Sequence, residues 1–340
     1  DRLRNDWLLL LGQRRNWAEF ERLHTEFRMQ DDKQLRCYDL AIASIEGRLP
    51  QHASTELQQL WMGQPANDDG CTYAASTLYA TEQLPALAVW QRARLGAERN
   101  QLSTARNALT IVAPQHVAAL AGLFKSPQAY LSNPKTTPPP ALATLALIRL
   151  ASSDPDQAAQ WLRTRWQQSL SAEEQHWVWG MIGKVAARRL SDNALDYFAQ
   201  VKQLTDLNDD SLAWLARAAL RAGQWGKVQR AIAAMSPAQQ QDSTWVYWQA
   251  RALLTQGTPA DQARAQSLLG SIAGVDGFYE QLAAEDLGQA VLPPPEPQPP
   301  TAEEIARAHA NPGLTRALYA IRIGLRSEGV REWNYTTNLH

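Results

Sequence analysis

The sequence predicts an all-α protein, a right-handed α-superhelix (solenoid) of tetratricopeptide-like helical hairpins that is U- or ring-shaped. Three observations predict it. Apolar residues recur at helical spacing almost throughout the 340 residues, with no sustained apolar/polar alternation of the strand type. Short helices come in pairs that repeat at a fixed period. Large aromatic residues recur at the same period, as expected where each hairpin buries its apolar face against its neighbours.

The repeat is clearest between residues 154 and 272. The second helix of each pair is predicted in the stretches 154–166, 190–201, 223–235 and 258–272. Taking Ala158, Ala194, Val228 and Ala265 as equivalent points gives spacings of 36, 34 and 37. A period in the mid-thirties with two helices per unit is typical of helical-hairpin solenoids.

The first helices of the pairs carry tryptophans at the same period. Trp177, Trp214 and Trp248 lie 37 and 34 residues apart. Large aromatics at these positions fill the space between stacked helices, so we interpret them as core rather than as platforms for a sugar or base. Trp7, Trp17 and Trp225 are interpreted as structural too.

Helix starts and proline-rich stretches divide the chain. Capping boxes, Ser171 with Glu174 and Thr301 with Glu304, start two helices, and this explains their first-turn glutamates without a catalytic role. Prolines in 132–141 predict an ordered connector, and those in 292–300 predict an extended linker. We therefore expect a superhelical domain over 1–291, a linker over 292–300 and the start of a further helical module over 301–340, all within a longer chain.

Composition excludes several classes of function. Charged residues make up 20% and nearly balance, with a formal net charge of -1, which argues against the clustered basic surface that nucleic acid or an anionic membrane requires. No apolar run approaches the roughly 18–20 residues of a membrane span. The six histidines show no metal-ligand spacing, and phosphate-loop, dinucleotide and serine-nucleophile motifs are absent. We predict no catalytic, cofactor-binding or metal-binding residue in this stretch.

Two features have open interpretations from the residues alone. The only cysteines, Cys37 and Cys71, are compatible with a disulfide and equally with two free thiols. In the stretch "TWVYWQARALLTQG" (244–257), Trp245 and Trp248 share one side of a helix and are predicted to be core. Tyr247 is rotated away from that side, and its polar tip makes it the candidate surface contact.

Several stretches, in order, resemble the soluble lytic murein transglycosylases. "WVYWQARALLTQG" (245–257) followed by "GFYEQLAAEDLG" (277–288) is similar to the end of that family's superhelical domain. "NDWLLLLGQRRNWAEF" (5–20) resembles its early hairpin, and "LRCYDLAIASIEGR" (35–48) with Cys71 its two-cysteine region. "RALYAIRIGLRSEGVREWNYT" (316–336), with Glu332 and Trp333, resembles the module after its proline-rich connector.

The resemblance implies a periplasmic scaffold without catalytic activity. Enzymes of this family act in cell-wall turnover, cleaving the MurNAc–GlcNAc bond of peptidoglycan without water to leave a 1,6-anhydro-muramoyl end. One Glu, in a lysozyme-like domain after the superhelix, acts as acid and then base. Its Glu-Ser and Gly-Leu-Met-Gln motifs do not occur in these 340 residues. The implied partners are glycan strands, the chain's own C-terminal catalytic domain and other cell-wall enzymes, and a periplasmic address implies a Cys37–Cys71 disulfide.

Two rival interpretations remain. One is a tetratricopeptide-like solenoid that binds proteins or peptides and is unrelated to peptidoglycan. The other is an α/α-toroid glycosidase complete in this chain, since a pair of carboxylates is enough for glycoside chemistry. Retention on purified peptidoglycan separates the scaffold from the first rival, and turnover of muropeptides by this chain alone would support the second.

Overall fold

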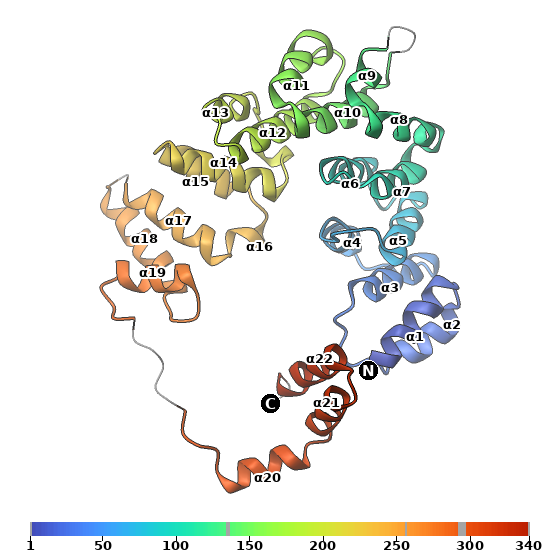
Figure 1. The fold of residues 1–340 in the computed structure, drawn as a ribbon, viewed down its shortest axis with the longest axis vertical. Helices are drawn as coiled ribbons and strands as arrows, with labels where there is room; N and C mark the ends of the chain where they lie inside the picture. Colours follow the sequence, from blue (N-terminus) through green and yellow to red (C-terminus); the bar gives the residue numbers. More distant parts are fainter. Residues whose placement is uncertain (1, 134–136, 256, 292–296, 339–340) are drawn as a thin grey trace. The chain divides into compact units, whose positions relative to one another are not determined.

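The protein is built from helices throughout the part that its computed structural model describes, residues 2–133, 137–255, 257–291 and 297–338 (Figure 1). No strand occurs within these ranges. Within each of the two units described below, many neighbouring helices pack against each other as hairpins, and adjacent hairpins pack on one another. This confirms the predicted all-α class.

The chain divides into two compact units, residues 1–92 with 296–340 (unit 1) and residues 93–295 (unit 2). The sequence-based boundaries at 291 and 301 remain a prediction. Within unit 1 lie α1 (Arg2–Gln13), α2 (Trp17–His24), α3 (Lys33–Ile45), α4 (Ala53–Met62), α5 (Asp69–Ala80), the first half of α6 (Ala86–Glu98), α20 (Ala302–Ala310), α21 (Pro312–Arg322) and α22 (Arg326–Thr337).

Unit 2 contains the regular part of the hairpin array. Its α-helices are the rest of α6 and α7 (Leu102–Val112), α8 (Leu120–Lys125), α9 (Pro127–Leu131), α10 (Pro140–Ser153), α11 (Pro155–Trp161), α12 (Ala172–Arg188), α13 (Ala194–Phe198), α14 (Asp209–Arg221), α15 (Trp225–Ala233), α16 (Pro237–Gln240), α17 (Ser243–Leu254), α18 (Pro259–Ile272) and α19 (Phe278–Asp286). Shorter turns occur at Pro114–Ala119, Leu162–Trp166 and Leu204–Asp206.

The predicted repeat matches four hairpin-forming helices of unit 2. α11, α13, α15 and α18 are the second helices, and the equivalent points Ala158, Ala194, Val228 and Ala265 are all buried. Small or β-branched residues at these points let the second helix lie close against the first, which is the contact that repeats along the array.

The predicted helix starts are also confirmed. Ser171 and Glu174 form a reciprocal capping box at α12, and Thr301 and Glu304 form another at α20. In each, the hydroxyl accepts from the backbone N–H three residues on, and the glutamate accepts from the N–H of the cap residue. These carboxylates therefore satisfy backbone donors that would otherwise lack partners.

The burial of the tryptophans does not follow their position in the repeat. Trp177 and Trp245 are buried, whereas Trp214 and Trp248 are partly buried. Trp17 packs against the core of unit 1. Trp7 is 47% exposed, so the expectation of a structural role for it is wrong. Of the predicted proline-rich segments, residues 134–136 and 292–296 lie outside the described residues.

The C-terminal helices of unit 1 contact its N-terminal helices. Arg331 of α22 forms a two-pronged ion pair with Asp31, with one hydrogen bond of 3.0 Å, and also donates to Asn5 Oδ1 at 3.1 Å. Asn5 is fully buried and donates in turn to Asp32. A charged group thus reaches a buried amide that is more than 300 residues away in sequence. None of the described helices is both long and apolar enough to cross a membrane.

Candidate functional site

A disulfide joins α3 to α5 in unit 1. Cys37 and Cys71 are bonded at an S–S distance of 2.02 Å with Cα atoms 4.8 Å apart, and both residues are fully buried. Cys71 lies in the first turn of α5, where Asp68 caps the helix by accepting from the Cys71 N–H at 2.6 Å. The bridge therefore fixes the start of α5 against the middle of α3.

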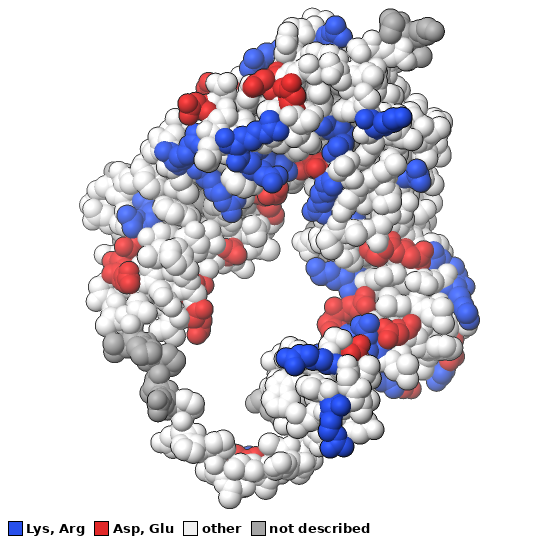
Figure 2. Space-filling model, viewed as in Figure 1, with Lys and Arg blue, Asp and Glu red and all other residues white. Residues whose placement is uncertain are grey.

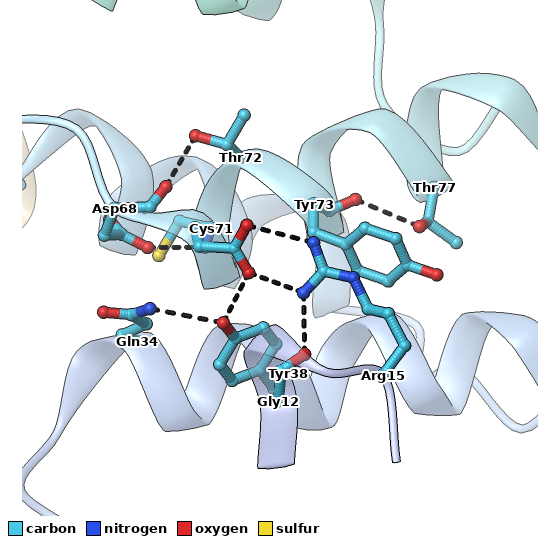
Figure 3. Close-up of polar contacts among 10 residues, drawn as sticks. Gly12, Arg15, Gln34, Tyr38, Asp68, Cys71, Thr72, Tyr73 and Thr77 are labelled. Atoms are coloured by element: carbon cyan, nitrogen blue, oxygen red, sulfur yellow. Dashed lines mark hydrogen bonds and ion pairs between the residues drawn. The ribbon is translucent and has the colours of Figure 1, made fainter. Parts of the chain in front are cut away.

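A polar cluster surrounds this bridge, and its hydrogen bonds can be followed in Figure 3. Arg15, between α1 and α2, donates to both oxygens of Asp69 at 2.5 and 3.0 Å. Tyr38 of α3 donates to the same carboxylate at 2.5 Å. The Arg15 guanidinium also lies over the Tyr73 ring, 3.9 Å from its centroid. Three elements therefore meet at one carboxylate.

Ionisation in this cluster favours the ion pair. Burial raises the pKa of Asp69, but the hydrogen bonds from Arg15 and Tyr38 lower it more, so that its net pKa lies below the ordinary value. Burial and the neighbouring Asp69 raise the pKa of the Tyr38 hydroxyl. The groups hold each other in their ionised or hydrogen-bonded forms, which suits a structural clamp rather than proton transfer at neutral pH.

Replacing Gly12 by alanine is expected to destabilise unit 1 by about 1–3 kcal/mol because the site is closely packed. A Cβ at Gly12 would lie 2.3 Å from the Tyr38 ring, and that ring is fully buried with its hydroxyl held by Asp69. The free energy of unfolding from urea titration measures the effect.

Gly226 provides a matched control on α15. A Cβ there meets nothing within 4 Å, so G226A is expected to be neutral or to stabilise by up to about 1 kcal/mol through helix propensity. Equal effects of G12A and G226A would contradict the close packing of Tyr38 against α1.

The aromatic cluster of α17 is internal, and this overturns the expectation for Tyr247. Its side chain is only 4% exposed and packs against Trp248 and against Tyr279 of α19. Its hydroxyl donates to Asp286 at 3.2 Å and accepts from Arg251 at 3.0 Å. A residue so enclosed offers no surface for a ligand, because α19 covers the side of α17 that faces away from Trp245.

A surface feature that the sequence did not indicate lies on α14. A groove of about 240 Å³ runs between the C-terminal end of α12, α13 and α14, and Arg217 and Arg221 lie at its edge. A second hollow of about 320 Å³ adjoins it at Arg217 and contains Asp209, Asp210 and Asp242. Neither hollow could be predicted, because their residues come from helices whose relative placement the local pattern leaves open.

Within the described ranges, no three His, Cys, Asp or Glu side chains are grouped so that they could hold a metal ion. His24 and His176 each pair with one carboxylate, Asp39 at 3.0 Å and Asp206 at 2.5 Å. His176 also accepts from the Lys202 N–H at 3.2 Å through its other ring nitrogen, so both of its nitrogens are engaged.

No protein-family model and no curated protein matches the chain. Solved structures do. The structure of an inactive mutant of the lytic transglycosylase Slt from Pseudomonas aeruginosa matches 99% of this chain with a TM-score of 0.58 and 22% identity. The 70-kDa soluble lytic transglycosylase from Escherichia coli matches 98% with a TM-score of 0.48, and such an enzyme in complex with bulgecin A matches 98% with 0.46, each at 18% identity.

These matches concern the fold and only part of each enzyme. The chain spans 55% of the Pseudomonas structure and 54% of each of the other two. Only the first has a TM-score that supports an argument, and at 22% identity it shows a shared helical fold. The fold implied by the sequence resemblance is therefore confirmed.

Proposed function

We propose that this chain is the superhelical, non-catalytic part of a periplasmic soluble lytic transglycosylase, where it carries the catalytic domain and helps to position the glycan strand. The observation that carries the proposal is the shared fold with Slt, which extends over 99% of this chain and about half of that enzyme. The parent protein would cleave the MurNAc–GlcNAc bond of peptidoglycan to 1,6-anhydro products.

Two independent features support the proposal. The order of the sequence stretches that resemble the family follows the chain from residue 5 to residue 336. The Cys37–Cys71 disulfide suits an oxidising compartment such as the periplasm, because cytosolic proteins seldom keep disulfides.

Activity of the parent protein tests the proposal directly. We expect the full-length gene product to release muropeptides with 1,6-anhydro ends from purified sacculi, identified by mass spectrometry, and the 340-residue chain to release none. Products with reducing ends would indicate a hydrolase and contradict the proposed chemistry. Turnover by the 340-residue chain alone would contradict its scaffold role.

Binding tests the positioning role separately. We expect the 340-residue chain to sediment with purified sacculi at physiological ionic strength. If the chain stays in the supernatant and instead retains a discrete protein partner, it is a tetratricopeptide-like binding solenoid, and the proposal is wrong.

A further inference from the structure

The groove between α12, α13 and α14 combines an aliphatic floor with a basic edge. Ala194 and Leu195 of α13 and Ala218 of α14 line the floor. Arg217 and Arg221 are four residues apart on α14, so both side chains project from one face of that helix. Figure 2 shows Lys and Arg side chains gathered over α12–α14 in unit 2.

Arg217 is held in place by aromatic rings rather than by an acid. Its guanidinium carbon lies 5.1 Å from the Trp214 ring centroid and 5.2 Å from that of Trp245. Within the described part of the chain, no carboxylate lies within ion-pair distance of it. Stacking on two rings leaves the in-plane N–H donors of the guanidinium free to bind a carboxylate in two-pronged geometry.

Arg221 is only weakly engaged. Its one ion pair with another described residue is with Asp192 at 3.2 Å, and the Asp192 side chain is completely exposed. Exposed pairs of this kind contribute little, because water and salt compete for both partners. A ligand carboxylate in the groove could therefore replace Asp192 on Arg221 and reach Arg217 as well.

Leu190, which lines the groove, has an unusual backbone conformation for a leucine. It follows the last turn of α12 with φ at 58° and is 67% exposed. The N–H of Leu190 donates to Ala187 and that of Ser191 to Ala186, the hydrogen-bond pattern of a Schellman motif, whose left-handed position is usually glycine.

The same turn ends other helices, with the polar residues Arg15, Glu82 and Asn100 at the left-handed position in three of them and glycine at the end of α14. There Gly223 occupies the equivalent position with φ at 66° and the equivalent hydrogen bonds. Among the described residues with positive φ, Leu190 is the one with an apolar side chain. A leucine here costs backbone strain and places an exposed apolar side chain on the groove, where a ligand can contact it.

The acidic residues of the neighbouring hollow determine on which side of Arg217 an anionic group can bind. Asp209, Asp210 and Asp242 line it on the far side of Arg217 and repel a carboxylate. A ligand anion is therefore favoured on the Arg221 side of Arg217, directly above the aliphatic floor.

We propose that this groove binds the C-terminal end of a peptide, with its free carboxylate on Arg217 and Arg221 and a small aliphatic side chain against Leu190 and Leu195. The complementarity of charge selects the carboxylate, and the alanine and leucine side chains that line the groove favour an aliphatic neighbour beside it. This binding site is additional to the proposed scaffold function and does not depend on it.

Fluorescence anisotropy with a dye-labelled tetra-alanine peptide tests the site on the 340-residue chain. We expect saturable binding with a Kd below about 1 mM for the free carboxylate and binding weaker by about tenfold or more for the C-terminal amide. R217Q and R221Q should each weaken binding of the carboxylate peptide to a similar extent. R230Q, on an exposed arginine of α15 that does not line the groove, should leave it unchanged.

Equal affinity for the acid and the amide, equal affinity of R217Q and R221Q with the unchanged chain, or no binding at millimolar peptide would each overturn the proposal. L190G provides a separate test, because it is expected to raise stability and to weaken peptide binding. Glycine should raise the melting temperature by relieving strain, while loss of the apolar contact weakens binding by about fivefold or more. If L190G is more stable and binds equally well, Leu190 has no part in the site.

Discussion

Replacing Glu98 by alanine is expected to destabilise unit 2 by about 3–5 kcal/mol, measured as the free energy of unfolding in urea. The Glu98 side chain is 5% exposed and forms an ion pair with the equally buried Lys184. It also accepts from Trp177 Nε1 at 2.7 Å and from Asn208 Nδ2 at 3.1 Å. Among the described residues, removing the carboxylate leaves the buried Lys184 ammonium with only the exposed Asp210, at 3.1 Å, as a charged partner.

The double variant E98Q/K184M distinguishes the cost of leaving Lys184 without its partner from the net contribution of the ion pair to stability. It keeps an oxygen acceptor for Trp177 and Asn208 and removes both charges, so its stability is expected to lie within about 1 kcal/mol of the unchanged chain. D192A, which breaks the exposed pair with Arg221, should cost less than about 1 kcal/mol. If E98A costs no more than D192A, the buried network is not a major stabilising feature.

The pH dependence of stability provides a second test of the network around Glu98 and Lys184. Burial lowers the pKa of Lys184, but Glu98 and Asp210 raise it more, so the net pKa lies above its ordinary value of 10.5. A group with a raised folded-state pKa contributes stability that is fully present below the unfolded pKa and is lost as the pH rises through the folded one. We expect the stability advantage of the unchanged chain over E98A to persist up to about pH 10.5 and to shrink above it.

Loss of the disulfide is expected to be the second large effect. The bridge closes a loop between residues that are 34 apart, and on the chain-entropy model its removal in C37A/C71A costs about 3–4 kcal/mol. Because both cysteines are fully buried, we expect a reductant to act slowly on the folded chain and quickly once it unfolds. The melting temperature with and without reductant measures the effect.

The control for the disulfide is built into the same experiment. C37A/C71A should melt at the same temperature with and without reductant, and the unchanged chain under reducing conditions should approach that value. If, in the absence of reductant, the unchanged chain and C37A/C71A melt at the same temperature, the bridge does not stabilise unit 1.

Much of the fold could be predicted because its signals are local. The capping boxes at Ser171 and Thr301 each involve residues three apart, and the helical hydrogen bonds that follow span four. The equivalent positions Ala158 and Val228 were identifiable because every hairpin repeats the same contact. The disulfide was different, since spacing left Cys37 and Cys71 open and only the family resemblance implied their pairing.

The candidate site was less predictable because burial depends on distant neighbours. The interpretation of Tyr247 considered one side of its own helix, whereas Tyr279 and Asp286 of α19 enclose it from the other. The Arg217 groove escaped notice for the same reason. One signal was present in the sequence: Leu190 stands at the end of α12, where the matching turn after α14 has Gly223.

The sequence by itself determined the helices, their starts, the hairpin period and the chemical types available, because each depends on residues within one or two turns or on their regular repetition. The tertiary structure alone decided which aromatic side chains are enclosed, that Glu98 meets Lys184 across 86 residues, and that Arg217 lies free between two tryptophans. The physical reason is that burial and ion pairing are set by surfaces that other helices bring from far along the chain.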